Sequence, residues 1–152
     1  KMYYYKLNLV HPNFKWYGSK ICKKKHLLSP QWLRNIKAKK YSLLRLDILF
    51  SKTKYNDICF IEDGGWHFTN IKSPEKIDFK MKNFLHHLEY EESGIDVEDI
   101  KKIVNEKKVF YDHSADKKQK KWSASTHLIK EDENLLPDYI YLNKDKFKEW
   151  LD

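Results

Sequence analysis

The first residues of the chain follow a period of two. Apolar or aromatic side chains occupy every second position, with other side chains between them: Tyr3, Tyr5, Leu7 and Leu9 against Tyr4, Lys6 and Asn8. Successive side chains of a β-strand point to opposite faces of a sheet. The pattern therefore predicts a strand over residues 3–9, with the end of a helix as the alternative for so short an aromatic-rich run.

A short helix is predicted to follow Ser29. The hydroxyl of Ser29 can cap the first backbone N–H groups, and Pro30 fits the first helical position. Trp32 and Ile36 then fall on one side of the helix. This helix is expected to end near Lys40.

The clearest helical period follows Ser73 and Pro74. Apolar side chains recur three or four positions apart and form one stripe: Ile77, Met81, Phe84, Leu85 and Leu88. This spacing predicts one continuous helix that buries the stripe. The same period turns Phe79 away from the stripe, which suggests a second surface.

The last third of the chain predicts two more helices and a strand. Asp96 is expected to cap a helix whose Ile100 faces inward. Residues 112–134 have little periodicity and predict a mobile loop. Residues 139–142 predict a short strand, and Asn143 is expected to cap a final helix.

Two extended segments are predicted on either side of the glycine turn Asp63-Gly64-Gly65. With the helices, they indicate an α/β chain. Its 152 residues are enough for one domain with a packed core. We therefore expect a single domain over residues 1–152.

The charge balance favours anionic partners. Lys and Arg number 30 against 22 Asp and Glu, a formal net charge of +8. Only Arg34 and Arg45 are arginines, although base readout preferentially uses arginine, and the lysines are spread along the chain. These features argue against nucleic acid as the partner. A basic noncatalytic module that binds anionic glycan or nucleic acid is the alternative to an enzyme.

Cysteine content and hydropathy bear on the compartment. Cys22 and Cys59 cannot form a disulfide framework, which favours a reducing compartment such as the cytoplasm. No apolar run approaches the roughly 18 residues of a membrane span. We expect no membrane segment within this sequence.

The richest candidate chemistry lies in the stretch Asp63-Gly64-Gly65-Trp66-His67-Phe68. Glycines allow close backbone approach, and a Trp face can pack against the apolar side of a sugar ring. A carboxylate accepts hydrogen bonds from sugar hydroxyls, and an imidazole can contact a diphosphate or a metal. The competing interpretation is a plain hairpin turn with Trp66 in the core.

This stretch resembles the family 17 glycosyltransferases, the bisecting N-acetylglucosaminyltransferase family. Glu75-Lys76-Ile77, Lys80 and Phe84-Leu85-His86 continue the resemblance. Further similar segments occur in the same order, at residues 3–8, 16–19, 28–31 with Arg34, and 136–139 with Asn143. The resemblance implies a GT-A-like (Rossmann-like) fold, of which this chain is the C-terminal, acceptor-side part. It also implies transfer of N-acetylglucosamine from a UDP-sugar donor to a glycan acceptor.

The resemblance also implies roles for particular residues. Asp63 is the first candidate for the catalytic base and Glu89 the second, while His67 contacts the donor diphosphate or a metal. His86 or His87 is a further candidate metal ligand, and the sequence leaves open which of them is equivalent to the family's histidine. The remaining candidates bind substrate: Gly64, Gly65, Trp66, Phe68, Lys80, Lys82 and Arg34.

The family's donor half carries an acidic Asp-x-Asp motif that holds the nucleotide through a divalent metal, Mn²⁺ or Mg²⁺. That motif lies upstream of the part matched here. The resemblance thus implies an N-terminal donor-binding half as a partner of this chain, and a Golgi address if the protein is animal-like. The remaining interpretation is that this chain is a noncatalytic remnant of such an enzyme and acts only as a folding or assembly partner.

Overall fold

The computed structural model describes residues 1–12, 14–42, 44–111, 122 and 126–152. The chain forms two compact units, each described by itself below. The larger contains Lys1–Trp16 and Gly65–Asp152, and the smaller is Tyr17–Gly64. The smaller unit is therefore an insertion in the sequence of the larger one. The expectation of one domain over residues 1–152 stays a prediction.

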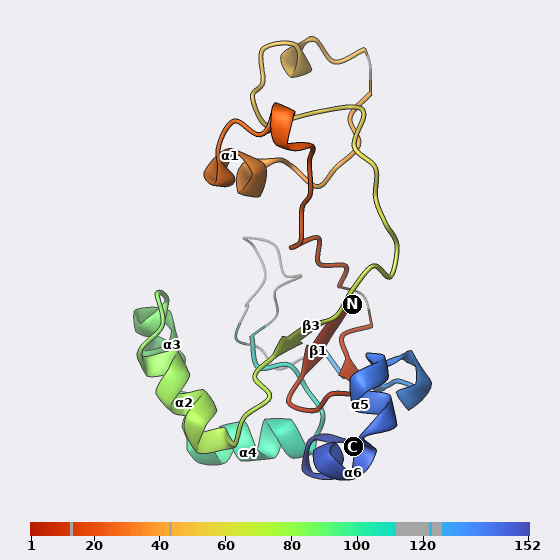
Figure 1. Cartoon of the computed structure of the whole chain (residues 1–152). Helices are drawn as coiled ribbons and strands as arrows, with labels where there is room; N and C mark the ends of the chain where they lie inside the picture. The colour runs from red at the N-terminus through yellow and green to blue at the C-terminus, as the bar shows by residue number, and fades with distance from the viewer. Residues whose placement is uncertain (13, 43, 112–121, 123–125) are drawn as a thin grey trace. The chain divides into compact units, whose positions relative to one another are not determined.

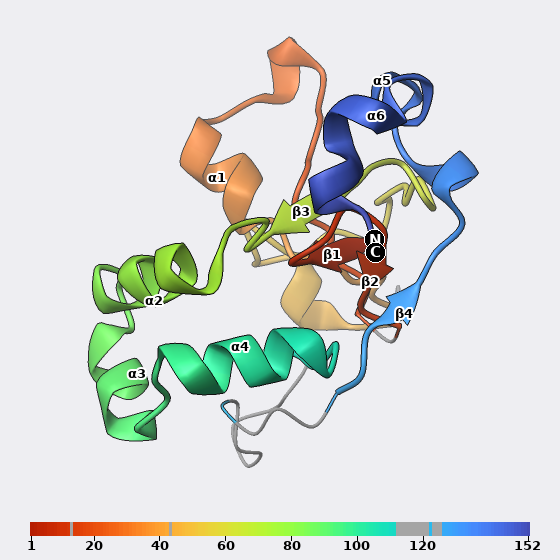
Figure 2. The same cartoon turned by 90° about the horizontal axis from the view of Figure 1, so that it is seen from below.

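The larger unit is built on a four-stranded mixed sheet in the order β3-β1-β2-β4. Figure 1 shows β1 beside β3, and Figure 2 labels all the strands of the sheet. β1 (Met2–Tyr4) pairs in parallel with β3 (His67–Thr69), so that Tyr3 lies opposite Phe68. β2 (Leu9–Val10) runs antiparallel to β1 and to β4 (Ile129–Lys130). Together with the helices, the sheet gives the described chain a mixed α/β architecture, as the sequence predicts.

Helices pack around this sheet in the larger unit. α2 (Pro74–Lys82) packs on α3 (His87–Ser93) and on α4 (Val97–Asn105), as Figure 2 shows. The C-terminal segment contains η3 (Glu133–Leu135), α5 (Asp138–Leu142), α6 (Lys144–Phe147) and η4 (Lys148–Trp150). Among the described helices, none is long and apolar enough to cross a bilayer.

The core lies between the sheet and the helices of the larger unit. Its buried side chains come from β1 and the residue after it, β2, α2, α3, α4 and the segments on either side of residues 112–121: Met2, Tyr4, Tyr5, Leu9, Ile77, Met81, Tyr90, Ile100, Val109, Phe110 and Leu128. Burial raises the pKa of the Tyr5 phenol, whose oxygen accepts a hydrogen bond from the backbone of Phe110. Tyr4 and Tyr5, near the N-terminus, are thus part of the core.

The strand predicted over residues 3–9 is wrong in extent. The chain leaves the sheet at Tyr5, which has a φ of 63°, and re-enters it at Leu9. Tyr4 and Asn8 are as fully buried as Tyr3, so the even positions do not face solvent. A left-handed residue reverses the chain here, and the period of two carries no sign of it.

The single helix predicted through residues 77–88 is also wrong. α2 ends at Lys82 and α3 begins at His87. Ile77 and Met81 are buried as expected, but Leu85 is 84% exposed and Leu88 63% exposed. Without burial of the second half of the stripe, little favours one continuous helix. Phe79 points outward as predicted, at 70% exposure.

The C-terminal segment departs from prediction in two places. Residues 139–142 are part of α5 and do not form a strand. Of the loop expected over 112–134, residues 112–121 and 123–125 lie outside the described chain, and the later part contains β4 and η3. β4 is held by pairing with β2, a contact that local sequence cannot show.

The smaller unit contains α1 (Pro30–Asn35) and two 3-10 helices, η1 (Lys24–His26) and η2 (Leu46–Ile48). The Ser29 hydroxyl accepts a 3.0 Å hydrogen bond from the backbone of Trp32, which confirms the predicted cap, although α1 ends before Lys40. The predicted extended segment before Asp63 is not a strand in the described structure.

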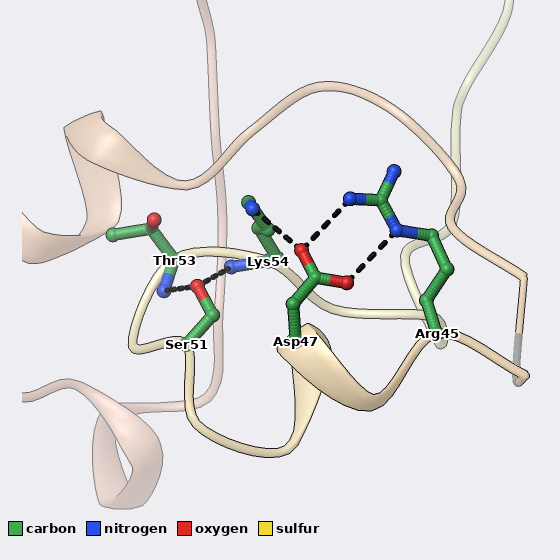
Figure 3. A network of polar contacts seen from close by, with 5 residues as sticks. All are labelled: Arg45, Asp47, Ser51, Thr53 and Lys54. Carbon is green, nitrogen blue, oxygen red and sulfur yellow. Dashed lines mark hydrogen bonds and ion pairs between the residues drawn. The ribbon is translucent and has the colours of Figure 1, made fainter.

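A charge cluster closes a loop in the smaller unit (Figure 3). Asp47 accepts two hydrogen bonds from Arg45 at 2.8 Å and one from Lys54 at 2.7 Å. The hydrogen bonds from Arg45 and Lys54 lower the pKa of the Asp47 carboxyl to about 2. The two cysteines of this unit, Cys22 and Cys59, are free thiols.

Candidate functional site

The glycine turn lies at the boundary of the two units. Asp63 has a φ of 49°, so the left-handed residue of the turn is the aspartate. A Cβ on Gly64 would meet Cγ2 of Ile61 at 3.0 Å, whereas nothing lies within 4 Å of one on Gly65. A side chain at position 64 would therefore need the exposed Ile61 side chain to shift, whereas position 65 has room for one.

Trp66 lies at the surface of the larger unit. Its indole N–H donates a 2.8 Å hydrogen bond to the carbonyl of Leu135, and 45% of the residue is exposed. The alternative interpretation, in which Trp66 fills the core, is wrong. The hydrogen bond fixes the edge of the indole while part of the ring system stays accessible.

His67 opens β3 and is packed against another aromatic ring. Its imidazole centroid lies 3.9 Å from that of Trp16, with the planes tilted by 37°. Burial lowers the pKa of His67, and the charge of Lys80 lowers it further. The imidazole is therefore neutral at pH 7 and can accept a proton, donate a hydrogen bond or bind a metal.

Phe68 follows His67 on the strand and so points to the opposite face of the sheet. Its ring lies 5.2 Å from that of Tyr3, the residue opposite it in β1. This packing makes Phe68 a cross-strand partner in the sheet. Its substrate-binding role stays a prediction.

Lys80 is tied to the end of β3 by Asn70, a residue that the sequence did not single out. The ammonium group donates a 2.6 Å hydrogen bond to Oδ1 of Asn70. Asn70 is buried and has a φ of 54°. Burial lowers the pKa of Lys80, and the charge of Lys72 adds to this effect. The signal available in the sequence was an Asn just after a strand, because Asn tolerates a left-handed backbone.

Lys82 faces a different set of groups. Its ammonium group lies 2.8 Å from Oδ2 of Asp78, whose other oxygen accepts a 2.8 Å hydrogen bond from the hydroxyl of Tyr90. Burial would raise the pKa of Asp78, but hydrogen bonds from Lys82 and Tyr90 outweigh it and the pKa is lowered. The hydrogen bond from Tyr90 to Asp78 joins α3 to α2, while Lys82 pairs with Asp78 within α2. The substrate-binding role of Lys82 stays a prediction.

Glu89 and the two candidate histidines form local contacts in and before α3. Nδ1 of His86 lies 3.1 Å from the Glu89 carboxylate, and Nδ1 of His87 lies 3.1 Å from the carbonyl of Phe84. Among the described residues, no hydrogen bond or ion pair joins Glu89 to His67 or Lys80. The structure does not bring the second candidate base to the first histidine.

Arg34 belongs to the smaller unit, at the C-terminal end of α1. Its carbonyl accepts a 2.6 Å hydrogen bond from Lys20, whose ammonium also contacts the carbonyl of Ile36 at 2.5 Å. These residues line a pocket of about 460 Å³ together with Lys37 and Thr53. Arg34 is thus part of a basic pocket within its own unit.

The described residues contain no group of three or more His, Cys, Asp and Glu side chains placed to hold a metal ion. Mn²⁺ and Mg²⁺ favour carboxylate and carbonyl oxygens. The predicted contacts of His67 and of His86 or His87 with a metal stay predictions.

Three comparisons set the chain against known proteins. Neither protein-family models, nor curated proteins, nor solved structures give a match. The resemblance to family 17 stays a prediction, and the case for a function rests on the chemistry of these residues.

Proposed function

We propose that this chain is the acceptor-side portion of a GT-A-like glycosyltransferase that transfers N-acetylglucosamine from UDP-N-acetylglucosamine to a glycan. One observation supports this most directly. The neutral imidazole of His67, on β3, lies within electrostatic reach of the half-buried ammonium group of Lys80, on α2. A hydrogen-bonding imidazole beside a fixed cation suits a diphosphate leaving group.

The leaving diphosphate gains negative charge as the bond to the sugar breaks. A positioned cation stabilises that charge in the transition state, and removal of one such group typically costs about 10²–10³ in kcat. Lys80 is held in place by Asn70, so little reorganisation is needed. In the proposed reaction, Lys80 neutralises the diphosphate and His67 hydrogen-bonds to it.

An inverting transfer also needs a base for the acceptor hydroxyl. Asp63 is the proposed base, since it is an exposed carboxylate in the motif that carries the family resemblance. The exposed part of Trp66 is proposed to pack on the acceptor sugar. No step of the proposal passes through a metal.

The test is a transfer assay on the full-length protein with UDP-N-acetylglucosamine and glycan acceptors that end in mannose, read by mass spectrometry. His67→Ala and Asp63→Asn are expected to lower transfer by about 10²-fold or more. Asn is chosen because it tolerates the left-handed backbone at position 63. His26→Ala and Asp57→Asn are matched surface controls and should keep full activity.

Transfer at the wild-type rate by both site variants would overturn the residue assignment. Absence of transfer from any UDP-sugar by the full-length protein would overturn the proposed function itself. Circular dichroism of each variant separates a lost site from a lost fold.

A further inference from the structure

The smaller unit carries most of the net charge of the chain. Residues 17–64 contain eleven Lys and Arg but only four Asp and Glu, a net charge of +7 out of the +8 of the whole chain. Lysines are spread along the entire sequence, so the imbalance comes from the scarcity of acidic residues in this stretch. None of the described residues of the unit is buried. Its apolar side chains are therefore available to a partner.

One closed loop of this unit combines positive charge with apolar surface. The backbone N–H of Lys37 donates a 2.8 Å hydrogen bond to the carbonyl of Thr53, which brings the two ends of the loop together. Beside this closure, the Ser51 hydroxyl accepts a 3.3 Å hydrogen bond from the backbone of Thr53 (Figure 3). The indole of Trp32 donates to the carbonyl of Lys52 at 2.7 Å and ties the loop to α1. Surface loops whose ends lie close together are frequently functional.

The loop exposes apolar side chains between its two ends. Within residues 44–50, which we call the apolar tip, four of them are 74–92% exposed: Leu44, Leu46, Leu49 and Phe50. Apolar side chains that are exposed singly need no explanation, but four in so short a stretch indicate an interaction surface.

Basic side chains flank the apolar tip on both sides. Lys39 and Lys40 precede it, and Lys52 follows it. Among the described residues, none of these three lysines has a carboxylate partner. The only acidic residue within residues 37–54 is Asp47, which is paired in the charge cluster of Figure 3. The loop therefore offers an apolar centre between uncompensated positive charges.

We propose that the apolar tip inserts into the surface of a lipid bilayer that contains anionic lipids, with the flanking lysines on the headgroups. Such a surface offers both chemistries, because acyl chains accept apolar side chains and acidic headgroups attract lysines. Nucleic acid is a poorer match, since its bases stack on aromatic rings and the tip is mainly leucine. The inference goes beyond the proposed transfer reaction, which needs no lipid.

The test is co-sedimentation of the full chain with vesicles of two compositions. One contains phosphatidylcholine alone, and the other contains phosphatidylcholine and phosphatidylserine in equal parts. The protein is expected to bind the mixed vesicles at least about tenfold more tightly, since each lysine near an anionic surface contributes about fivefold. Binding to the mixed vesicles should weaken as salt is added.

Two variants separate the apolar contribution from the charge. Leu44→Gln/Phe50→Gln should weaken binding to the mixed vesicles by about tenfold or more, because two apolar side chains no longer leave water. Both side chains are exposed, so the fold should be kept, as circular dichroism can check. Lys39→Gln/Lys40→Gln should weaken binding to the mixed vesicles and leave binding to phosphatidylcholine unchanged.

Matched controls make the same changes in the larger unit. Leu85→Gln/Leu142→Gln removes two apolar side chains of similar exposure, and Lys102→Gln/Lys130→Gln removes the same charge from exposed positions. Both should bind the vesicles as the wild type does. In nanodiscs of the mixed lipids, a spin-labelled lipid should broaden the amide NMR signals of residues 44–50.

Several results would overturn the inference. They are equal binding to the two kinds of vesicle, equal binding by the wild type and Leu44→Gln/Phe50→Gln, and no binding at millimolar lipid. Self-association of the wild type without lipid that is lost in this variant would also overturn it, because a second copy would then cover the tip. So would salt-sensitive binding of nucleic acid without binding of vesicles.

Discussion

The side-chain oxygen of Asn70 accepts a 2.6 Å hydrogen bond from Lys80, and Asn70 holds a left-handed backbone with a φ of 54°. One residue therefore both ends β3 and positions the cation of α2. A hydrogen bond to a charged group contributes about 1.5–3 kcal/mol, and a left-handed backbone costs most residues about 1–2 kcal/mol.

Substitution of Asn70 separates these two contributions. Asn70→Gly removes the hydrogen bond but accepts the left-handed backbone, whereas Asn70→Ala loses both. We expect urea unfolding to show the Ala variant less stable than the Gly variant by about 1 kcal/mol. Equal stability of the two variants would show that the backbone at this position is not strained.

The titration of His67 reports on its neighbours. Its NMR titration midpoint is expected below about 6.5, the ordinary pKa of histidine, because burial and the charge of Lys80 both disfavour the imidazolium. Lys80→Gln should raise the midpoint of His67 part of the way toward the ordinary value, because the burial of the imidazole remains. Lys82→Gln is the control and should leave it unchanged, as Lys82 pairs with Asp78.

The same shift makes stability depend on pH. The folded pKa of His67 is lowered, so the unfolded chain binds the proton more tightly. The contribution of neutral His67 is complete above about pH 6.5 and is lost as the pH falls toward the folded pKa. As the pH falls through this window, the urea midpoint of the wild type should therefore decrease relative to that of His67→Gln. Outside the window, the difference between the two midpoints should stay constant.

The hydrogen bond between Tyr90 and Asp78 joins α3 to α2. Tyr90→Phe removes it, and we expect urea unfolding to show a loss of about 1.5–3 kcal/mol at pH 7, because Asp78 is charged and nearly buried. Tyr139→Phe is the control, since Tyr139 is 64% exposed, and its stability should match the wild type.

Acid unfolding should also depend on the hydrogen bond between Tyr90 and Asp78. The folded pKa of Asp78 is lowered, so its contribution is present above the unfolded value of about 3.9 and is lost as the pH falls through the folded pKa. Tyr90→Phe raises the pKa of Asp78, so the variant should lose stability at a higher pH than the wild type. Identical acid transitions would contradict this assignment.

The start of α4 offers a clean test of capping. Asp96 accepts a 2.9 Å hydrogen bond from the backbone of Asp99, whose carboxylate accepts one from the backbone of Asp96. Asp96→Ala is expected to cost about 1 kcal/mol in thermal or urea unfolding, and Asp96→Ser to cost much less. Ser73→Ala should cost less than Asp96→Ala, because Ser73 precedes α2 without a side-chain cap bond.

The features predicted correctly from sequence are those with local causes. A cap depends on residues three positions apart, so Ser29 and Asp96 could both be identified before the structure. The inward position of Ile100 and the outward position of Phe79 follow from the helical period in the same way.

The features that were missed depend on contacts between distant residues. The extended segment predicted after the glycine turn is present as β3, but its parallel pairing with β1 links distant parts of the sequence and was not predicted. The bond from Lys80 to Asn70 requires both α2 and β3 to be placed. The break between α2 and α3 depends on whether Leu85 and Leu88 find a partner surface, and periodicity carries no information on that.

The contact between Trp16 and His67 has a consequence for how the protein can vary. Trp16 is the last residue of the larger unit before the insertion, and His67 lies just after the chain returns, with ring centroids 3.9 Å apart. The two junctions of the inserted stretch are therefore neighbours within one scaffold. The entropic cost of closing such a stretch rises only with the logarithm of its length. Residues 17–64 thus occupy a position where segments of different length can be exchanged without changing the register of β1 and β3.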